Sequence, residues 1–129
     1  MAKLLIPGSM GELFDKITIL EIKAERIADP AKLKNVNHEL ALLQALAGGR
    51  GSVSGHAELV AELKTVNEAL WDIEDRIRDC EREKDFGPRF VALARAVYQT
   101  NDKRAHIKKQ INVLSGSDIV EEKSYAATS

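Results

Sequence analysis

The sequence is poor in several features that would each point to a particular class of protein. It holds one cysteine, three prolines and 5% aromatic residues. A single cysteine excludes a framework of disulfides within the chain. A hydrophobic content of 44% with so few prolines excludes a disordered chain. We therefore expect a folded globular protein that works in a reducing compartment.

Charge and hydropathy exclude further classes. The formal net charge is −1, so no overall field attracts the protein to nucleic acid or to an anionic membrane. The apolar runs are far shorter than the roughly 20 residues of a membrane span. Residues 1–8 are too short for a signal peptide, and residues 3–6 form either an extended strand or a loop packed on the remaining structure. We expect a cytoplasmic protein that does not enter the membrane.

Motifs that would carry chemistry are also scarce. The three histidines lie far apart, and none has a second ligand at helical spacing, so we expect no metal and no cofactor. Residues 48–55 hold four glycines, but a phosphate loop follows a strand and ends in Lys-Ser/Thr. This stretch is better interpreted as a linker. Cys80 lies on an apolar seam, which favours a buried structural thiol over a nucleophile.

The clearest pattern is a heptad seam across residues 56–84. Apolar residues recur there in alternating steps of three and four, which predicts a coiled-coil-like helix of about 43 Å with one buried face. A helix this long and this one-sided needs other helices, or a second copy of the chain, to cover it. The seam consists of His56, Leu59, Leu63, Val66, Leu70, Ile73, Ile77 and Cys80.

Three further seams predict three more helices, each set off by a break in the sequence. Ser9 and Glu12 form a capping box, Asp29-Pro30 suits a helix start, and Gly116 follows the last seam. We expect an all-α fold over a single domain, 1–129: a four-helix antiparallel bundle in which the last two helices form a long hairpin and the first two a shorter pair. The expected helices are 9–28, 30–47, 56–84 and 88–114, with a tail at 115–129.

The fourth expected helix carries polar residues where its seam should be apolar. Asn101, Arg104 and Lys108 share one face. A buried charge needs a partner, and Glu74 or another acid could supply it for Arg104. We favour a buried polar layer that fixes helix register; the alternative is a pocket between helices for a small anion. The candidate residues are Lys16, Glu74, Arg78, Asn101, Arg104 and Lys108.

Two other features allow two interpretations each. The basic cluster Lys103, Arg104, Lys108 and Lys109 is better explained as a solvated helix face than as a nucleic-acid site. Trp71 lies one step off the seam, where it either packs at the edge of the core or forms an exposed hot spot for an interaction.

Several strings together resemble a known family. They are GELFDKITILEIK at 11–23, LWDIEDRIR at 70–78, LARAVY at 93–98, NDKRA at 101–105, IK at 107–108 and EEKSY at 121–125. With them the chain resembles, over nearly its whole length, a family of short, all-helical bacterial proteins that is known only as a domain of unknown function. The resemblance implies a bacterial, cytoplasmic protein that forms one complete domain, and it implies no activity and no catalytic residue.

A looser likeness is to the all-helical chorismate mutases, which also line pockets between long helices with Arg, Lys and Glu. Only Arg26, Arg104 and Lys108 echo their basic residues, and no residue-by-residue match holds. It is a likeness of architecture, from which no function follows.

The sequence favours a structural or protein-interaction module over an enzyme. The expected short pair cannot cover the whole seam of the long hairpin, so we expect a homodimer and a structural or protein-interaction role. The alternative is a protein or enzyme that binds a small carboxylate or phosphate between its helices. We give less weight to a nucleic-acid partner.

Overall fold

The computed structural model describes residues 4–48 and 56–116, and within these ranges it contains four helices and no strand. The predicted all-α fold is thereby confirmed. Residues 1–3, the linker 49–55 and the tail 117–129 lie outside the described ranges. The helices are α1 (Met10–Arg26), α2 (Pro30–Ala47), α3 (His56–Glu83) and α4 (Pro88–Ser115).

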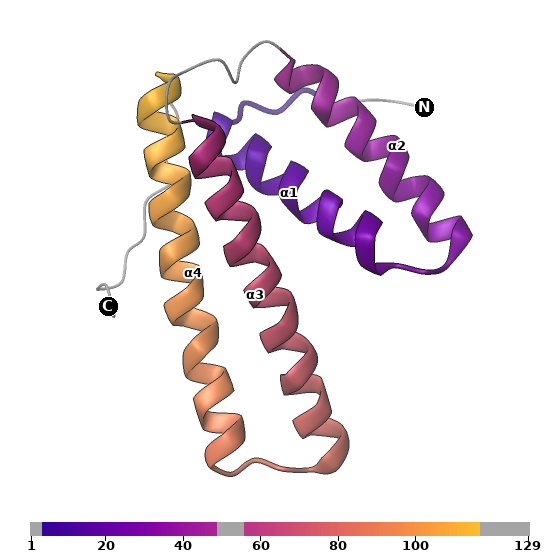
Figure 1. Cartoon of the computed structure of the whole chain (residues 1–129), viewed down its shortest axis with the longest axis vertical. Helices are drawn as coiled ribbons and strands as arrows, with labels where there is room; N and C mark the ends of the chain where they lie inside the picture. The colour runs from indigo at the N-terminus through magenta and orange to yellow at the C-terminus, as the bar shows by residue number, and fades with distance from the viewer. Residues whose placement is uncertain (1–3, 49–55, 117–129) are drawn as a thin grey trace.

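The four helices form two antiparallel pairs of unequal length (Figure 1). α3 and α4 have 28 residues each, or about 42 Å, whereas α1 and α2 have 17 and 18. α1 lies across the end of the hairpin that holds the start of α3 and the end of α4. α2 packs along α1, and its backbone approaches neither α3 nor α4. The half of the hairpin that ends in the α3–α4 turn therefore projects beyond the short pair.

The helix ends follow from local chemistry. The Ser9 hydroxyl accepts a hydrogen bond from the Glu12 amide at 3.2 Å, and the Asp29 carboxylate accepts one from the Ala31 amide at 3.2 Å. Pro30 occupies the first turn of α2, where a missing amide hydrogen costs nothing. α4 ends at Gly116, whose φ of 67° suits glycine because it has no Cβ.

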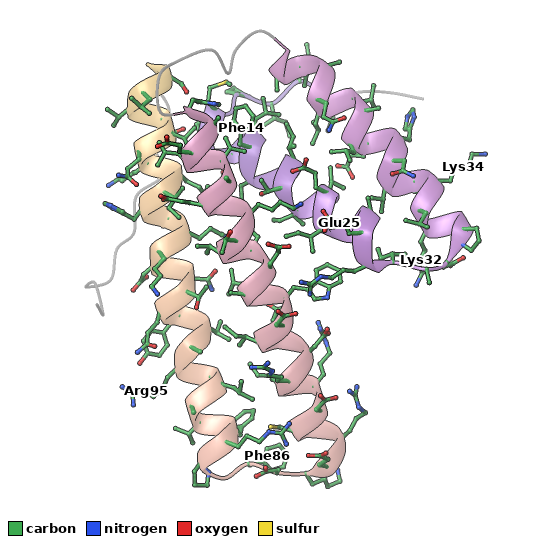
Figure 2. The ribbon with its side chains drawn as sticks, in the orientation of Figure 1. Phe14, Glu25, Lys32, Lys34, Phe86 and Arg95 are labelled. Carbon is green, nitrogen blue, oxygen red and sulfur yellow. The ribbon has the colours of Figure 1, made fainter. Side chains whose placement is uncertain are left out.

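The core lies where α1 meets the hairpin. Leu63 of α3 and Ile111 of α4 are fully buried, and Phe14 of α1 packs edge-on against the His56 ring with the ring centroids 4.6 Å apart (Figure 2). Burying an aliphatic or aromatic side chain of this size contributes about 1.5–3 kcal/mol. The core cluster contains Phe14, Ile17, Leu63, Ile107 and Ile111.

Two expectations about apolar residues have opposite outcomes. Cys80 is fully buried, as its seam position predicts. The N-terminal apolar segment, in contrast, forms no strand over its described residues and does not pack on the helices. Leu4, Leu5 and Ile6 are 84%, 97% and 78% exposed, so that expectation was wrong.

The start of α1 approaches α4 very closely at Gly11. The Gly11 amide donates to the Asn112 side-chain oxygen at 2.7 Å, which satisfies an amide that has no partner within its own helix. A Cβ at position 11 would lie 2.6 Å from the Lys108 carbonyl oxygen, closer than real Cβ atoms come. Glycine at position 11 therefore allows the start of α1 to pack this closely against α4.

We expect Gly11→Ala to destabilise the protein by about 1–3 kcal/mol, because the new methyl group forces α1 away from α4. This loss would exceed the roughly 1 kcal/mol by which alanine favours a helix over glycine. The check is urea unfolding beside Gly8→Ala, where the nearest atom is 4.0 Å from the new Cβ and the expected change is within about 0.5 kcal/mol. Equal midpoints for both variants would contradict the close approach.

Candidate functional site

A buried acid, Asp15, lies at the centre of the interface between α1 and the hairpin. The Asn67 side-chain amide donates to Asp15 Oδ1 at 3.0 Å and to Thr18 Oγ1 at 3.0 Å. The Thr18 hydroxyl donates to the Asp15 backbone carbonyl oxygen at 2.9 Å. These three buried residues join α1 to α3 through polar contacts.

Two cations from α4 face the same carboxylate. Arg104 Nε lies 3.8 Å from Asp15 Oδ1, and Lys108 Nζ lies 3.8 Å from Asp15 Oδ2. The Lys108 side chain is 8% exposed and that of Arg104 is 32% exposed. We call Asp15, Thr18, Asn67, Arg104 and Lys108 the Asp15 layer. It carries one negative and two positive charges.

The layer compensates for the free-energy cost of burying the Asp15 carboxylate. A carboxylate taken out of water is tolerated only when charges and hydrogen bonds replace the solvent. Asn67 and the two cations supply both, and they come from different helices. Lys108 is buried in this layer, whereas Arg104 is still partly open to solvent. That the layer fixes helix register stays a prediction.

Arg104 also borders a small cavity where α1 leaves the hairpin. No described residue forms a hydrogen bond with its guanidinium, whose contact with Asp15 is too long for one, and the Asn101 side chain likewise has none. The cavity has a volume of about 160 Å³ and is lined by Ile19, Asn67, Leu70, Trp71, Glu74, Asn101 and Arg104.

The structure brings together some of the predicted site residues and not others. Glu74, Asn101 and Arg104 line the cavity, and Lys108 lies in the Asp15 layer. Lys16 is exposed on α1 and is not among the cavity residues. Arg78 is exposed and lies 3.8 Å from Glu74 on its own helix.

The acid that faces Arg104 is Asp15 rather than Glu74. Asp15, Thr18 and Asn67 were not among the candidate residues predicted from the sequence. A signal was present, because Asp15 and Thr18 are three residues apart beside the seam residue Ile17, and Asn67 follows Val66.

The basic cluster is divided between opposite sides of α4. Arg104 and Lys108 face α1, whereas Lys103 and Lys109 are exposed. The four residues therefore do not form one continuous basic surface.

Trp71 is half-buried beside the cavity and is held by a neighbour on α1. The Arg26 guanidinium lies over its ring, 5.8 Å from the centroid, and pairs with Asp72 at 2.6 Å. The hydrogen bond to Asp72 raises the pKa of Arg26. These contacts fasten the end of α1 to α3.

A second ion pair fastens the same part of α1. Lys64 donates to Glu25 at 2.5 Å, and this hydrogen bond raises the pKa of the Lys64 ammonium. Its contribution to stability is therefore complete below the unfolded pKa of about 10.4 and is lost as the pH rises through the higher folded value.

A larger groove lies between α3 and α4 on the side away from α1. Its volume is about 930 Å³. Of its lining residues Ile107 is buried, Val66 and Asp102 are half-buried, and the others are exposed. This groove was not predicted from the sequence, because a seam predicts which residues face a neighbour and not whether the neighbour is present. It is lined by Ala61, Glu62, Thr65, Val66, Gln99, Asp102, Lys103, His106, Ile107 and Gln110.

Two features are absent from residues 4–48 and 56–116. No group of three His, Cys, Asp or Glu residues is placed to hold a metal ion there. None of the helices in these ranges is long and apolar enough to cross a membrane.

The chain belongs to the family of unknown function DUF6165, whose sequence pattern matches residues 4–129. This confirms the resemblance that the sequence strings carry. No curated protein and no solved structure matches the chain.

Asp15 is a buried structural group, whereas Arg104 is a half-exposed wall of the cavity. Substitutions at the two positions should therefore lower the free energy of unfolding by different amounts. Asp15→Ala removes the acceptor that Asn67, Arg104 and Lys108 face, at a cost of about 3–5 kcal/mol. Arg104→Ala should cost about 1 kcal/mol or less, because water solvates a third of its side chain.

Urea unfolding checks this order, with the exposed Lys16→Ala as a control that should stay within about 0.5 kcal/mol of the wild type. If Arg104→Ala cost as much as Asp15→Ala, the guanidinium would be a structural part of the layer and not a wall of the cavity.

Proposed function

We propose that the protein is a self-associating helical module, a homodimer in which each groove between α3 and α4 receives the same face of a second copy. The observation that carries this proposal is the groove of about 930 Å³ on the side of the hairpin that α1 leaves uncovered. Two hairpins packed through this face would form a four-helix arrangement, a common solution for long antiparallel helices.

The charges at the groove support a second copy as the occupant. Glu62 and Asp102 carry negative charge there, and Lys103 carries positive charge. In a two-fold interface the same patch meets itself, so a patch with both signs can place each acid near a base of the partner. A patch of a single sign would repel its own copy.

The unequal helix lengths also support association. α1 spans about 25 Å and crosses a hairpin about 42 Å long, so it cannot cover the whole seam. Phe86, Val91 and Tyr98 on the projecting half are 53%, 52% and 40% exposed. Uncovered apolar surface of this kind favours association.

A second candidate function is the binding of a small anion beside Arg104. The observation in its favour is the Arg104 guanidinium, which borders a cavity and forms no hydrogen bond with a described residue. Guanidinium groups bind carboxylates and phosphates through paired hydrogen bonds.

Both candidates are binding functions, and neither assigns a catalytic residue. We place the protein in the bacterial cytoplasm, where a buried free thiol such as Cys80 stays reduced. The division of the basic cluster between two sides of α4 argues against a nucleic-acid partner.

We expect the wild type to sediment as a dimer at about tens of micromolar, a concentration that populates most specific dimers. Ala61→Arg should give a monomer, because it places a long charged side chain in the groove. Ala41→Arg on the exposed side of α2 is the matched control and should leave the dimer intact.

Circular dichroism of each variant verifies that the helices are retained. A monomeric wild type would contradict self-association. A dimer that persists in Ala61→Arg would place the interface outside the groove.

A further inference from the structure

We infer that the cavity beneath α1 binds small monocarboxylates that have a compact apolar body. This inference rests on the second candidate function, anion binding, and is independent of whether the chain forms dimers. It assigns the polar wall of the cavity to the carboxylate and the apolar wall to the body of the ligand.

The polar wall is built by α4. Asn101 and Arg104 are three residues apart, so their side chains lie on the same face of the helix. Neither side chain forms a hydrogen bond with a described residue, and both line the cavity. The guanidinium presents parallel N–H donors that match the two oxygens of a carboxylate, and the Asn101 amide adds another donor.

The charges around the cavity favour a monoanion over a phosphate dianion. Asp15 lies 3.8 Å from Arg104 Nε, and Glu74 lines the cavity as well. A dianion would meet two carboxylates. Arg104 and Lys108 balance the charges of Asp15 and Glu74, and Arg78 is shared between Glu74 and Asp75, so these groups leave no surplus positive charge. A monoanion therefore meets less repulsion here than a dianion does.

The apolar wall sets the size of the ligand. Ile19, Leu70 and Trp71 supply apolar surface from α1 and α3. The volume of about 160 Å³ is below the range for drug-sized ligands, and a protein cavity of about 150 Å³ is known to hold benzene. The body of the ligand should therefore be a short branched chain or a single ring.

Trp71 is held in place before any ligand arrives. Arg26 lies over its ring and is itself paired with Asp72. A wall fixed in this way loses little side-chain freedom on binding, which favours affinity.

The test uses the full chain and four probes. Trp71 is the only tryptophan, so its fluorescence reports directly on the cavity, and calorimetry measures the affinity independently. Isovalerate and benzoate should bind, whereas benzamide, which has nearly the shape of benzoate without its charge, should bind at least about tenfold more weakly. Inorganic phosphate should also bind at least about tenfold more weakly than benzoate.

Variants locate the site. Arg104→Gln should weaken benzoate binding by about tenfold or more, because it removes the charged partner. Asn101→Asp keeps the size of the side chain and adds a like charge, so it should have a similar effect through a different residue. Arg95→Gln is the matched control on the same helix, since Arg95 is exposed and points away from the hairpin (Figure 2), and it should leave binding unchanged.

The outcomes distinguish a wrong ligand class from a failure of anion binding, the function on which the inference rests. If phosphate binds through Arg104 and both carboxylates fail, the site binds anions but the ligand class is wrong. If none of the probes binds, anion binding itself is overturned. Benzoate binding that is unchanged in both Arg104→Gln and Asn101→Asp would overturn the assignment of the polar wall.

Discussion

The carboxylate of Asp15 is the group on which the arrangement of α1, α3 and α4 depends. It is buried, and its oxygens face Asn67 of α3 and Arg104 and Lys108 of α4. Because these partners come from two helices, shifting α1 along the hairpin would leave a buried charge without compensation, which costs several kcal/mol. Apolar packing brings the helices together, and we propose that Asp15 fixes their register.

The position of α1 creates both candidate sites. One end of α1 packs closely against α4 at Gly11. The ion pairs of Glu25 and Arg26 attach its other end to α3. The small cavity forms where α1 diverges from α4, and the larger groove stays open on the other side of the hairpin. A short helix that crosses a long hairpin thus leaves a small cavity on one side of the hairpin and a larger groove on the other.

The sequence predicted the helices well because the relevant signals are local. The Ser9 cap, Asp29-Pro30 and the heptad seams each act within a few residues, and the all-α fold follows from them. The arrangement as a long hairpin with a shorter helix pair was predicted too, and the structure confirms it. The sequence did not show which helices the backbone of α2 approaches. An apolar face is the same in the sequence whether one helix or two cover it, so the separation of α2 from the hairpin could not be foreseen.

At the candidate site too, features within one helix could be predicted from the sequence, whereas contacts between distant residues could not. Asn101, Arg104 and Lys108 were visible as polar residues on an apolar seam, and all three face the interior region between the helices. The sequence could not decide between possible partners of Arg104, because Asp15 is 89 residues away in the chain and Glu74 fitted the pattern equally well. The contact of Gly11 with Asn112 spans 101 residues and had no signal in the sequence.

The most direct test of the central role of Asp15 is a double-mutant cycle with Lys108, measured by urea unfolding of Asp15→Asn, Lys108→Met and the double variant. If the buried pair holds α1 in register, the two substitutions are coupled by about 1 kcal/mol or more, because the second removes the charge that the first leaves without its carboxylate. Effects that add within about 0.3–0.5 kcal/mol would show that the two side chains do not interact and would contradict the account.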